Sequence, residues 1–444
     1  MNLNRPAPLD KPRKTGPSWP REFLMLFRGT NAPFALVTAA RWLAFASSAV
    51  IVVGIAPSQI LLGLALLALF LSGEKLRLPP IKWILGLFLA GTLVAVLLSG
   101  HPAAGFPQVK KIYVFCQLLV AYSLLRDTRM ARWLIMAWSG LASISAFRGF
   151  VQFANKFYHA LAIHRDFYAA YMGERITGFM SHWYTFSDIE MLVLIMLGAF
   201  ILFSPAARRF LWLWLLLELL IGSGILLAET RAVWIATAIS VLYLTWFWKK
   251  WVTALVPVVM AAALILGPHT FRERAESIVH PGRDDSNQFR TILDRTGMRM
   301  IEAHPWFGLG PEEPRIQFMS YLPPDVPLPL PSGSYMHLHN LYLEYAAERG
   351  IPVLLLMLAM LGKILWDYAL ALRKLAPGLS DRRFLLHGGI AVVIAILVEG
   401  FADVNLGDSE VLTMFLVTVA LGYMAAEPLP VSERPADKEL APAA

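Results

Sequence analysis

Cysteine and charged residues are scarce in this sequence. Only one of the 444 residues is a cysteine, and charged residues make up 16% of the chain. A single cysteine excludes an intramolecular disulfide, a zinc site built from several thiolates and an iron–sulfur cluster. So little charge, beside 57% apolar residues, excludes an ordinary soluble domain and is typical of a protein that crosses a membrane many times.

Three motifs of common enzyme classes are also missing. The sequence has no Walker-type phosphate loop, no His-Glu-x-x-His and no Gly-x-Ser-x-Gly. ATP hydrolysis and the familiar membrane hydrolases therefore lose support. The segments outside the apolar runs also hold few carboxylates close together, which argues against a metal ion held by an aspartate cluster. We expect neither a metal nor another cofactor.

Long apolar segments divide the chain. A helix that crosses the hydrocarbon needs about 20 mostly apolar residues, because its backbone groups must be hydrogen-bonded within the helix. The segments that meet or approach this length are 34–56, 58–73, 82–99, 112–125, 131–153, 186–204, 210–228, 231–248, 251–267, 350–371, 384–402 and 410–426. We predict an all-α polytopic membrane protein with about 12 transmembrane helices.

Basic residues alternate between these segments. Cytoplasmic connections retain Lys and Arg, and the chain before the first span is basic. Every second later connection is basic too, at Lys75, Arg77 and Lys82, at Arg126, Arg129 and Arg132, at Arg208 and Arg209, at Lys249 and Lys250, and at Arg373, Lys374, Arg382 and Arg383. The pattern predicts an even number of spans with both ends in the cytoplasm. Lys110 and Lys111 are the exception, on the outer side.

The expected organisation has five parts. They are a cytoplasmic tail 1–33, nine spans in 34–267, a large, partly helical extracytoplasmic loop 268–349, three spans in 350–426 and a cytoplasmic tail 427–444. The loop is too long for a simple connection, and loops of this length usually carry function or are disordered.

Two histidines precede a short helical segment at the end of the long loop. His339 and Asn340 stand where a helix N-cap belongs, and Asn is among the best caps. Gly350 and Pro352 then separate this segment from the next span. We expect a short surface helix on the outer leaflet with His337 and His339 at its head. Histidine exchanges a proton near pH 7, although both residues could simply be polar residues at the membrane surface.

Two arginines are the next candidates. Arg175 lies in Gly-Glu-Arg-Ile-Thr-Gly, and Arg231 begins a predicted span. A guanidinium at the mouth of a helix bundle can bind a phosphate through two charge-assisted hydrogen bonds. A charge at the position of Arg231 is costly without a partner. The alternatives are an arginine that reaches lipid headgroups and an ordinary loop arginine. Glu174 and Glu229 are expected to orient their neighbouring arginines.

Polar residues of two further outer segments could line the same mouth. His182 and Tyr184 precede the sixth predicted span, and Asp403 and Asp408 lie between the last two. The two aspartates could contact a sugar or the histidines. Packing residues and a solvated turn are the alternatives.

Four blocks of sequence resemble the O-antigen ligase family, which shares a membrane domain with O-antigen polymerases and bacterial protein O-oligosaccharyltransferases. The blocks are Glu174–Phe179, Thr230–Trp234, Met300–Pro311 and His339–Gly350. Each block is weak alone, but their order and spacing carry the resemblance over residues 170–410.

The resemblance implies a metal-independent glycosyltransferase in the inner membrane of a Gram-negative bacterium, with its active site facing the periplasm. It implies transfer of a glycan from undecaprenyl diphosphate to a sugar hydroxyl of lipid A-core, with inversion of the anomeric centre. The expected partners are this donor, this acceptor and membrane lipids, without nucleic acid or ATP.

The resemblance also implies roles for individual residues. Arg175 and Arg231 correspond to the arginines that would bind the diphosphate, and His339 to the catalytic histidine. His337 stands two residues earlier and leaves the catalytic assignment open between the two. The further candidates for substrate binding are His182, Asn340 and Asp403.

Three other activities stay open. A polymerase would use another lipid-linked repeat as acceptor, and a protein O-oligosaccharyltransferase would use a protein. A transporter or flippase would also carry arginines near the membrane. A transporter would more naturally show paired interrupted helices and an inverted repeat, and we see neither in the sequence.

Overall fold

The computed structural model describes residues 32–266, 272, 285–330, 335 and 337–428. These residues form helices joined by turns, and none of them is in a strand. The all-α prediction is confirmed for this part of the chain. The expected tails 1–33 and 427–444, like most of 268–284, lie almost entirely outside the described residues.

The helices follow the apolar segments closely. The first half of the chain forms α2 (Ala32–Val50), α3 (Ile55–Ser72), α4 (Lys82–Leu98), α5 (Phe106–Lys110), α6 (Ile112–Leu124), α7 (Thr128–Ala162), α8 (Phe167–Gly173), α9 (Trp183–Phe203), α10 (Leu211–Leu227) and α11 (Arg231–Trp248). The second half forms α12 (Lys250–Thr253), α13 (Leu255–Leu266), α15 (Asp285–Ala303), α16 (Glu313–Tyr321), α17 (Leu341–Arg349), α18 (Ile351–Lys374), α19 (Asp381–Glu399) and α20 (Ser409–Ala426). Two 3-10 helices are η1 (Pro205–Phe210) and η3 (Asn405–Gly407).

Seven helical segments of the described chain are long and apolar enough to cross a membrane. They are α3, α7, α9, η1 with α10, α11, α18 and α20. The chain is therefore an all-α polytopic membrane protein. The larger count of about 12 spans stays a prediction. The expected span 251–267 divides at Ala254 into α12 and α13.

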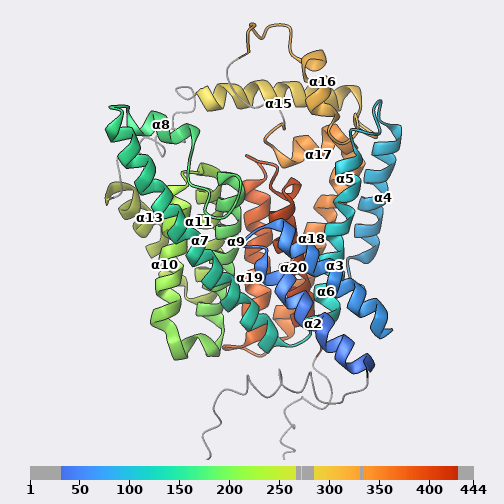
Figure 1. Cartoon of the computed structure of the whole chain (residues 1–444), viewed down its shortest axis with the longest axis vertical. Coiled ribbons are helices and arrows are strands. Elements are labelled where there is room, and N and C mark those ends of the chain that lie inside the picture. Colours follow the sequence, from blue (N-terminus) through green and yellow to red (C-terminus); the bar gives the residue numbers. More distant parts are fainter. Residues whose placement is uncertain (1–31, 267–271, 273–284, 331–334, 336, 429–444) are drawn as a thin grey trace, which may run out of the picture.

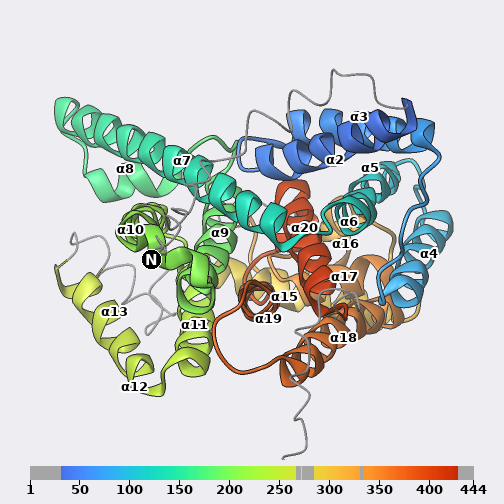
Figure 2. The same cartoon turned by 90° about the horizontal axis from the view of Figure 1, so that it is seen from below.

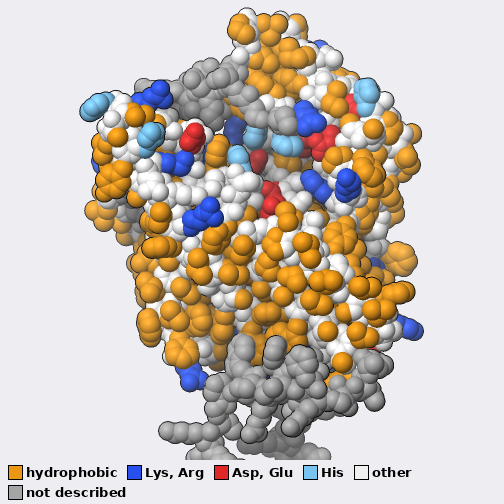
Figure 3. All heavy atoms as spheres, in the orientation of Figure 1, with side chains coloured by type: hydrophobic (Ala, Val, Ile, Leu, Met, Phe, Trp, Pro, Cys, Tyr) orange, Lys and Arg blue, Asp and Glu red, His pale blue; other side chains and the backbone are white. Residues whose placement is uncertain are grey.

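The centre of the bundle is formed by α9, α19 and α20 (Figure 2). The apolar stretch of α9 is 89% buried and that of α20 is 83% buried, against 28% for α3. The outer helices therefore expose apolar side chains where a soluble protein would expose polar ones. Figure 3 shows this surface as a broad hydrophobic belt, with Lys, Arg, Asp, Glu and His gathered mainly above it.

The basic connections meet at one end of the bundle. Arg77, between α3 and α4, pairs with Glu427 beyond α20 at 2.7 Å. Arg132, near the start of α7, pairs with Asp381 at the start of α19 at 3.2 Å. The opposite end is covered by α15 and α17 (Figure 1). This arrangement agrees with the alternation of charge along the sequence.

Two glycines allow the loop after α15 to pack closely against the end of α17. The N–H groups of Leu309 and Gly310 donate to the carbonyls of Ala347 and Glu348 at 2.8 and 2.9 Å. Gly308 has a φ of 67°, and a Cβ there would lie 2.4 Å from the carbonyl carbon of Glu348. The Met300–Pro311 block thus includes the close contact that holds α17 in place.

The prediction of a surface helix after His339 is wrong. Asn340 caps α17 as expected, but seven of the nine residues of α17 are buried. Its polar side is satisfied inside the protein: Glu344 accepts a hydrogen bond from the Leu338 N–H at 2.7 Å, and Glu348 pairs with Arg349. The polar residues of α17, which we expected to face solvent, therefore form hydrogen bonds and an ion pair inside the protein.

Candidate active site

The first turn of α9 contacts several segments that hold candidate residues. The Trp183 ring lies beneath the guanidinium of Arg175, 5.1 Å from ring centroid to Cζ. The hydroxyl of Tyr184 accepts a hydrogen bond from Arg290 Nη2 at 3.1 Å. The Tyr184 ring also lies beside His339, with centroids 6.4 Å apart. Two residues of α9 thus bring together parts of the chain that are far apart in sequence.

The next residues of α9 connect two more helix starts. Thr185 Oγ1 donates to Asp408 Oδ2 at 2.5 Å, and Asp408 caps α20. The hydroxyls of Ser187 and Thr230 share a hydrogen bond of 3.0 Å, and Arg231 is the first residue of α11. The N-terminal ends of α9, α11 and α20 therefore converge. Aligned peptide dipoles make such ends partly positive, which favours an anion.

His339 is held by Asp403. Its Nδ1 lies 3.1 Å from Asp403 Oδ1, and the side chain is 22% exposed. Burial raises the pKa of the Asp403 carboxyl. The hydrogen bond and the charge of His339 together lower this pKa by more, so it lies below its usual value. A carboxylate only accepts, so Nδ1 carries the proton and Nε2 is the free acceptor.

The backbone at His339 supports this orientation. Its φ is 48°, in the left-handed region that a side chain seldom adopts. The following Leu341 N–H donates to the carbonyl of Gly400 at 2.8 Å, next to the turn that carries Asp403. Strain of this kind persists only where surrounding contacts fix the backbone.

His337 has different surroundings. Its Nδ1 lies 3.4 Å from Glu344 Oε1, and its side chain is 50% exposed. The hydrogen bond that His337 donates to Glu344 raises the pKa of His337, against the effect of burial. His337 therefore holds a proton more readily than an isolated histidine.

His182 caps α9. Its Nδ1 accepts a hydrogen bond from the Tyr184 N–H at 3.2 Å, and the two rings are stacked with centroids 5.7 Å apart. Burial lowers the pKa of His182, the Asp403 charge opposes this, and the Arg175 charge adds to it. The imidazole is thereby kept neutral beside Arg175 and Asp403.

Hydrogen bonds link the segment around Arg175 to α7 and to α10. Gln152 Oε1 on α7 accepts from the Thr177 N–H at 2.9 Å. The Tyr171 hydroxyl donates to the Leu227 carbonyl at 2.6 Å, four residues before Arg231. These bonds place the loop against the end of α10.

The two neighbouring glutamates have different surroundings. Glu174 pairs with Lys156 at 3.3 Å, and its expected role in orienting Arg175 stays a prediction. Glu229 is fully buried in the turn before α11, at a φ of 50°. Its role beside Arg231 stays a prediction.

The expected cap at Asn340 is confirmed. Asn340 Oδ1 accepts from the N–H groups of Tyr342 and Leu343 at 3.0 and 3.2 Å. This hydrogen bonding explains the residue as the start of α17. A role in substrate binding stays a prediction.

Two basic residues near the site were missed. Arg290 lies on α15, and no motif surrounds it in the sequence. Lys111 Nζ donates to the Gly407 carbonyl at 2.6 Å, between Asn405 and Asp408. Burial lowers the pKa of Lys111, opposed by Glu312 and other acidic groups. Its signal was the break in the charge alternation.

Comparison with known families agrees with this geometry. Residues 216–358 match the family described as O-antigen ligase. The match begins in α10 and ends in α18, and so includes Arg231, Arg290 and His339. A comparison with curated proteins finds no match. Residues 216–358 thus form an O-antigen ligase family domain in a multi-pass membrane enzyme of glycosyltransferase type, from a bacterial family that also includes polymerases and O-oligosaccharyltransferases.

Proposed function

We propose that the protein is an O-antigen ligase, which transfers a glycan from undecaprenyl diphosphate to a sugar hydroxyl of lipid A-core. The observation that carries the proposal is the pair of His339 and Asp403, 3.1 Å apart, beside Tyr184, whose hydroxyl accepts a hydrogen bond from Arg290. A base beside an anion site is what transfer from a diphosphate requires.

The anion site would receive the leaving group. As the bond between the anomeric carbon and the diphosphate oxygen breaks, the electron pair goes to that oxygen. Arg175 and Arg231 bind the diphosphate and stabilise this charge, since fixed cations aimed at developing charge lower the barrier. The guanidinium fork matches phosphate oxygens. The starts of α9 and α11 add their dipoles, and Arg290 is a third cation nearby.

The acceptor would be activated by His339. Its Nε2 takes the proton of the acceptor hydroxyl while that oxygen forms the new bond to the anomeric carbon. Asp403 is the positioning residue: it keeps Nδ1 protonated and stabilises the imidazolium that forms. Attack opposite to the departing diphosphate inverts the anomeric centre, as in other reactions where a base activates the nucleophile directly.

We assign the base to His339 on geometry. It is held by Asp403, which hydrogen-bonds to Nδ1 and leaves Nε2 to accept. Its side chain is 22% exposed, whereas that of His337 is 50% exposed. His339 also lies beside Tyr184, whose hydroxyl accepts a hydrogen bond from Arg290.

The site would face the periplasm. The basic connections of Arg77 and Arg132 lie at the opposite end from α15 and α17. Because basic connections stay in the cytoplasm, the end that carries His339 would lie outside. In this orientation, the expected loop 268–349 would lie in the periplasm, and the chain would cross the membrane about 12 times.

The acceptor that is glycosylated distinguishes a ligase from a polymerase and from an oligosaccharyltransferase. Purified protein in detergent is given an undecaprenyl-diphosphate glycan without ATP, and one of three acceptors: lipid A-core, a second lipid-linked repeat, or a protein. A ligase glycosylates lipid A-core alone. A product on the lipid-linked repeat alone would identify a polymerase, and one on the protein an oligosaccharyltransferase. A transporter would yield no covalent product with any acceptor.

A further inference from the structure

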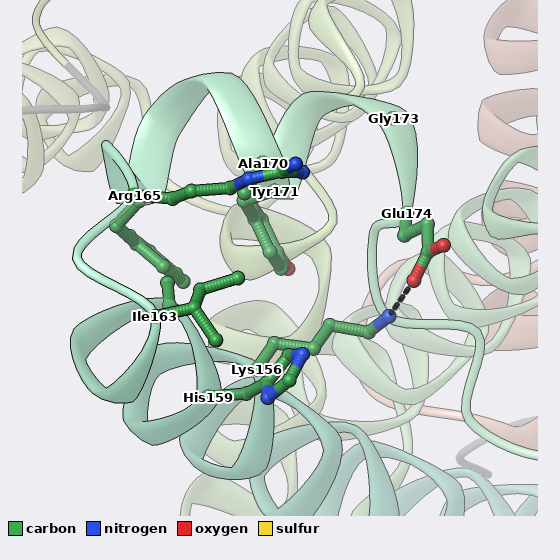
Figure 4. Close-up of a pocket in the computed structure, with 10 residues that line it drawn as sticks. Lys156, His159, Ile163, Arg165, Ala170, Tyr171, Gly173 and Glu174 are labelled. Carbon is green, nitrogen blue, oxygen red and sulfur yellow. Dashed lines mark hydrogen bonds and ion pairs between the residues drawn. The ribbon is translucent and has the colours of Figure 1, made fainter.

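A pocket lies between the last turns of α7, α8 and the segment that leads to Arg175. Its volume is about 480 Å³, within the range of sites for small molecules. Its lining includes Lys156, His159, Arg165, Phe167, Tyr171 and Glu174. Lys156 and His159 lie on one side and Arg165 on the other, with Tyr171 between them (Figure 4). The transfer reaction proposed above assigns no step to these basic side chains.

The lining favours an anion. Lys156, His159 and Arg165 are basic side chains, and Glu174 is the acidic side chain of the lining. The ion pair between Lys156 Nζ and Glu174 Oε2 is 3.3 Å long, and the Glu174 side chain is 83% exposed. An exposed pair of this kind is weak, so a phosphate can replace Glu174 as the partner of Lys156.

The end of α7 does not need these basic side chains as caps. The backbone N–H groups of Ile163, His164 and Arg165 donate to carbonyls of its last turn at 3.2, 3.2 and 3.0 Å. His164 takes up a φ of 51°, the left-handed conformation that ends many helices. Backbone groups alone thus end α7.

The length of α7 puts the pocket at the level of lipid headgroups. Its 35 residues extend over about 52 Å, whereas the hydrocarbon is about 30 Å thick. The helix starts at the end where Arg132 lies, so its last turns pass beyond the hydrocarbon. Tyr158 and Leu161 expose 69% and 54% of their surface near the pocket, as residues at a lipid boundary do.

We propose that this pocket binds the phosphate group of an anionic lipid headgroup. Lys156 and Arg165 supply the charge-assisted hydrogen bonds from opposite sides, and His159 adds a third donor. The site is separate from the diphosphate site of Arg175 and Arg231, and binding to it does not depend on glycan transfer. A lipid headgroup and free phosphate share the recognised chemistry.

Lipid retention by the purified full-length protein tests the proposal. The protein in detergent is mixed with phosphatidylglycerol or phosphatidylcholine, and the bound lipid is measured by native mass spectrometry. We expect phosphatidylglycerol to be preferred, and Lys156→Gln and Arg165→Gln each to weaken its binding about tenfold. Glu174→Gln should strengthen it, because Lys156 loses its competing partner.

Lys110→Gln is the matched control. Lys110 is a basic residue on α5, across the molecule from α8 (Figure 2), and its loss should leave retention unchanged. Displacement of the lipid by inorganic phosphate would show that the phosphate group alone is recognised. Retention despite inorganic phosphate would identify the lipid as the required source. Equal retention by wild type, Lys156→Gln and Arg165→Gln would overturn the proposal.

Discussion

His339 and Asp403 form the contact on which the residue-scale account depends. The carboxylate lies against Nδ1 and its pKa is held below the usual value. This arrangement does two things for catalysis: it fixes the tautomer and it stabilises the protonated ring.

Asp403→Asn should lower the maximal transfer rate about 100-fold, because general-base catalysis contributes on this scale. The Michaelis constant for the donor should change little. Initial rates measured at varied donor concentration check both effects. A raised Michaelis constant with an unchanged maximal rate would contradict the positioning role of Asp403.

His337→Gln should leave transfer nearly intact and affect stability in a pH-dependent way. The folded pKa of His337 is raised by Glu344. The stability from this contact is therefore complete below the unfolded pKa of about 6.5 and is lost as pH rises through the folded pKa. The thermal midpoint should fall more at pH 5.5 than at pH 8.5, both about one to two units from that value. Loss of transfer with a normal midpoint would move the catalytic role to His337.

Candidate site residues could be predicted from the sequence only where they lie in a recognisable motif or at the start of a predicted helix. His339, Arg175 and Arg231 stand in recognisable blocks. Arg290 does not, and its position depends on a hydrogen bond to Tyr184, which is 106 residues away. Contacts of that kind leave no local pattern.

At the scale of elements, the helices were predictable and their contacts were not. Apolar runs fixed the helix positions because backbone groups in hydrocarbon must be satisfied internally. The boundaries were less accurate where polar residues extend a helix. The expected span 186–204 omits the first turn of α9, which contacts Arg175, Arg290 and Asp408. The expected span 131–153 omits the part of α7 that lines the pocket.

Gly308→Ala should destabilise the α17 region. The new Cβ would lie 2.4 Å from a backbone carbon of Glu348, at a left-handed φ. Neither side can move easily, so we expect a loss of about 3 kcal/mol or more. Thermal unfolding in detergent measures the loss. Gly362→Ala is the control, since nothing lies within 4 Å of a Cβ at Gly362. Equal midpoints would contradict the close contact.

At the scale of the whole molecule, two of the basic connections lie at one end of the bundle, as the alternation of charge predicts. Arg77 and Arg132 meet partners from the other end of the sequence at the basic end. The same alternation could not show that α17 is buried, because α4, α15, α16 and α18 surround it from distant parts of the chain. The alternation of charge predicts the orientation of each helix, but it does not predict which helices pack together.

Cysteine labelling in intact cells checks the orientation. In a Cys116→Ala background, Pro324→Cys should react with a membrane-impermeant maleimide, because it lies in the exposed turn after α16. Leu379→Cys, at the basic end and 43% exposed, should react only after the membrane is permeabilised. The reverse pattern would place the His339 end in the cytoplasm.

The most direct test of the central claim is glycan transfer by purified protein with and without His339. The wild-type protein is given an undecaprenyl-diphosphate glycan and lipid A-core in detergent, with EDTA and without ATP, and the product is measured by gel mobility. We expect transfer by the wild type and a loss of about 100-fold or more in His339→Ala, with a thermal unfolding transition that shows the variant is still folded. Near-normal transfer by folded His339→Ala would contradict the account.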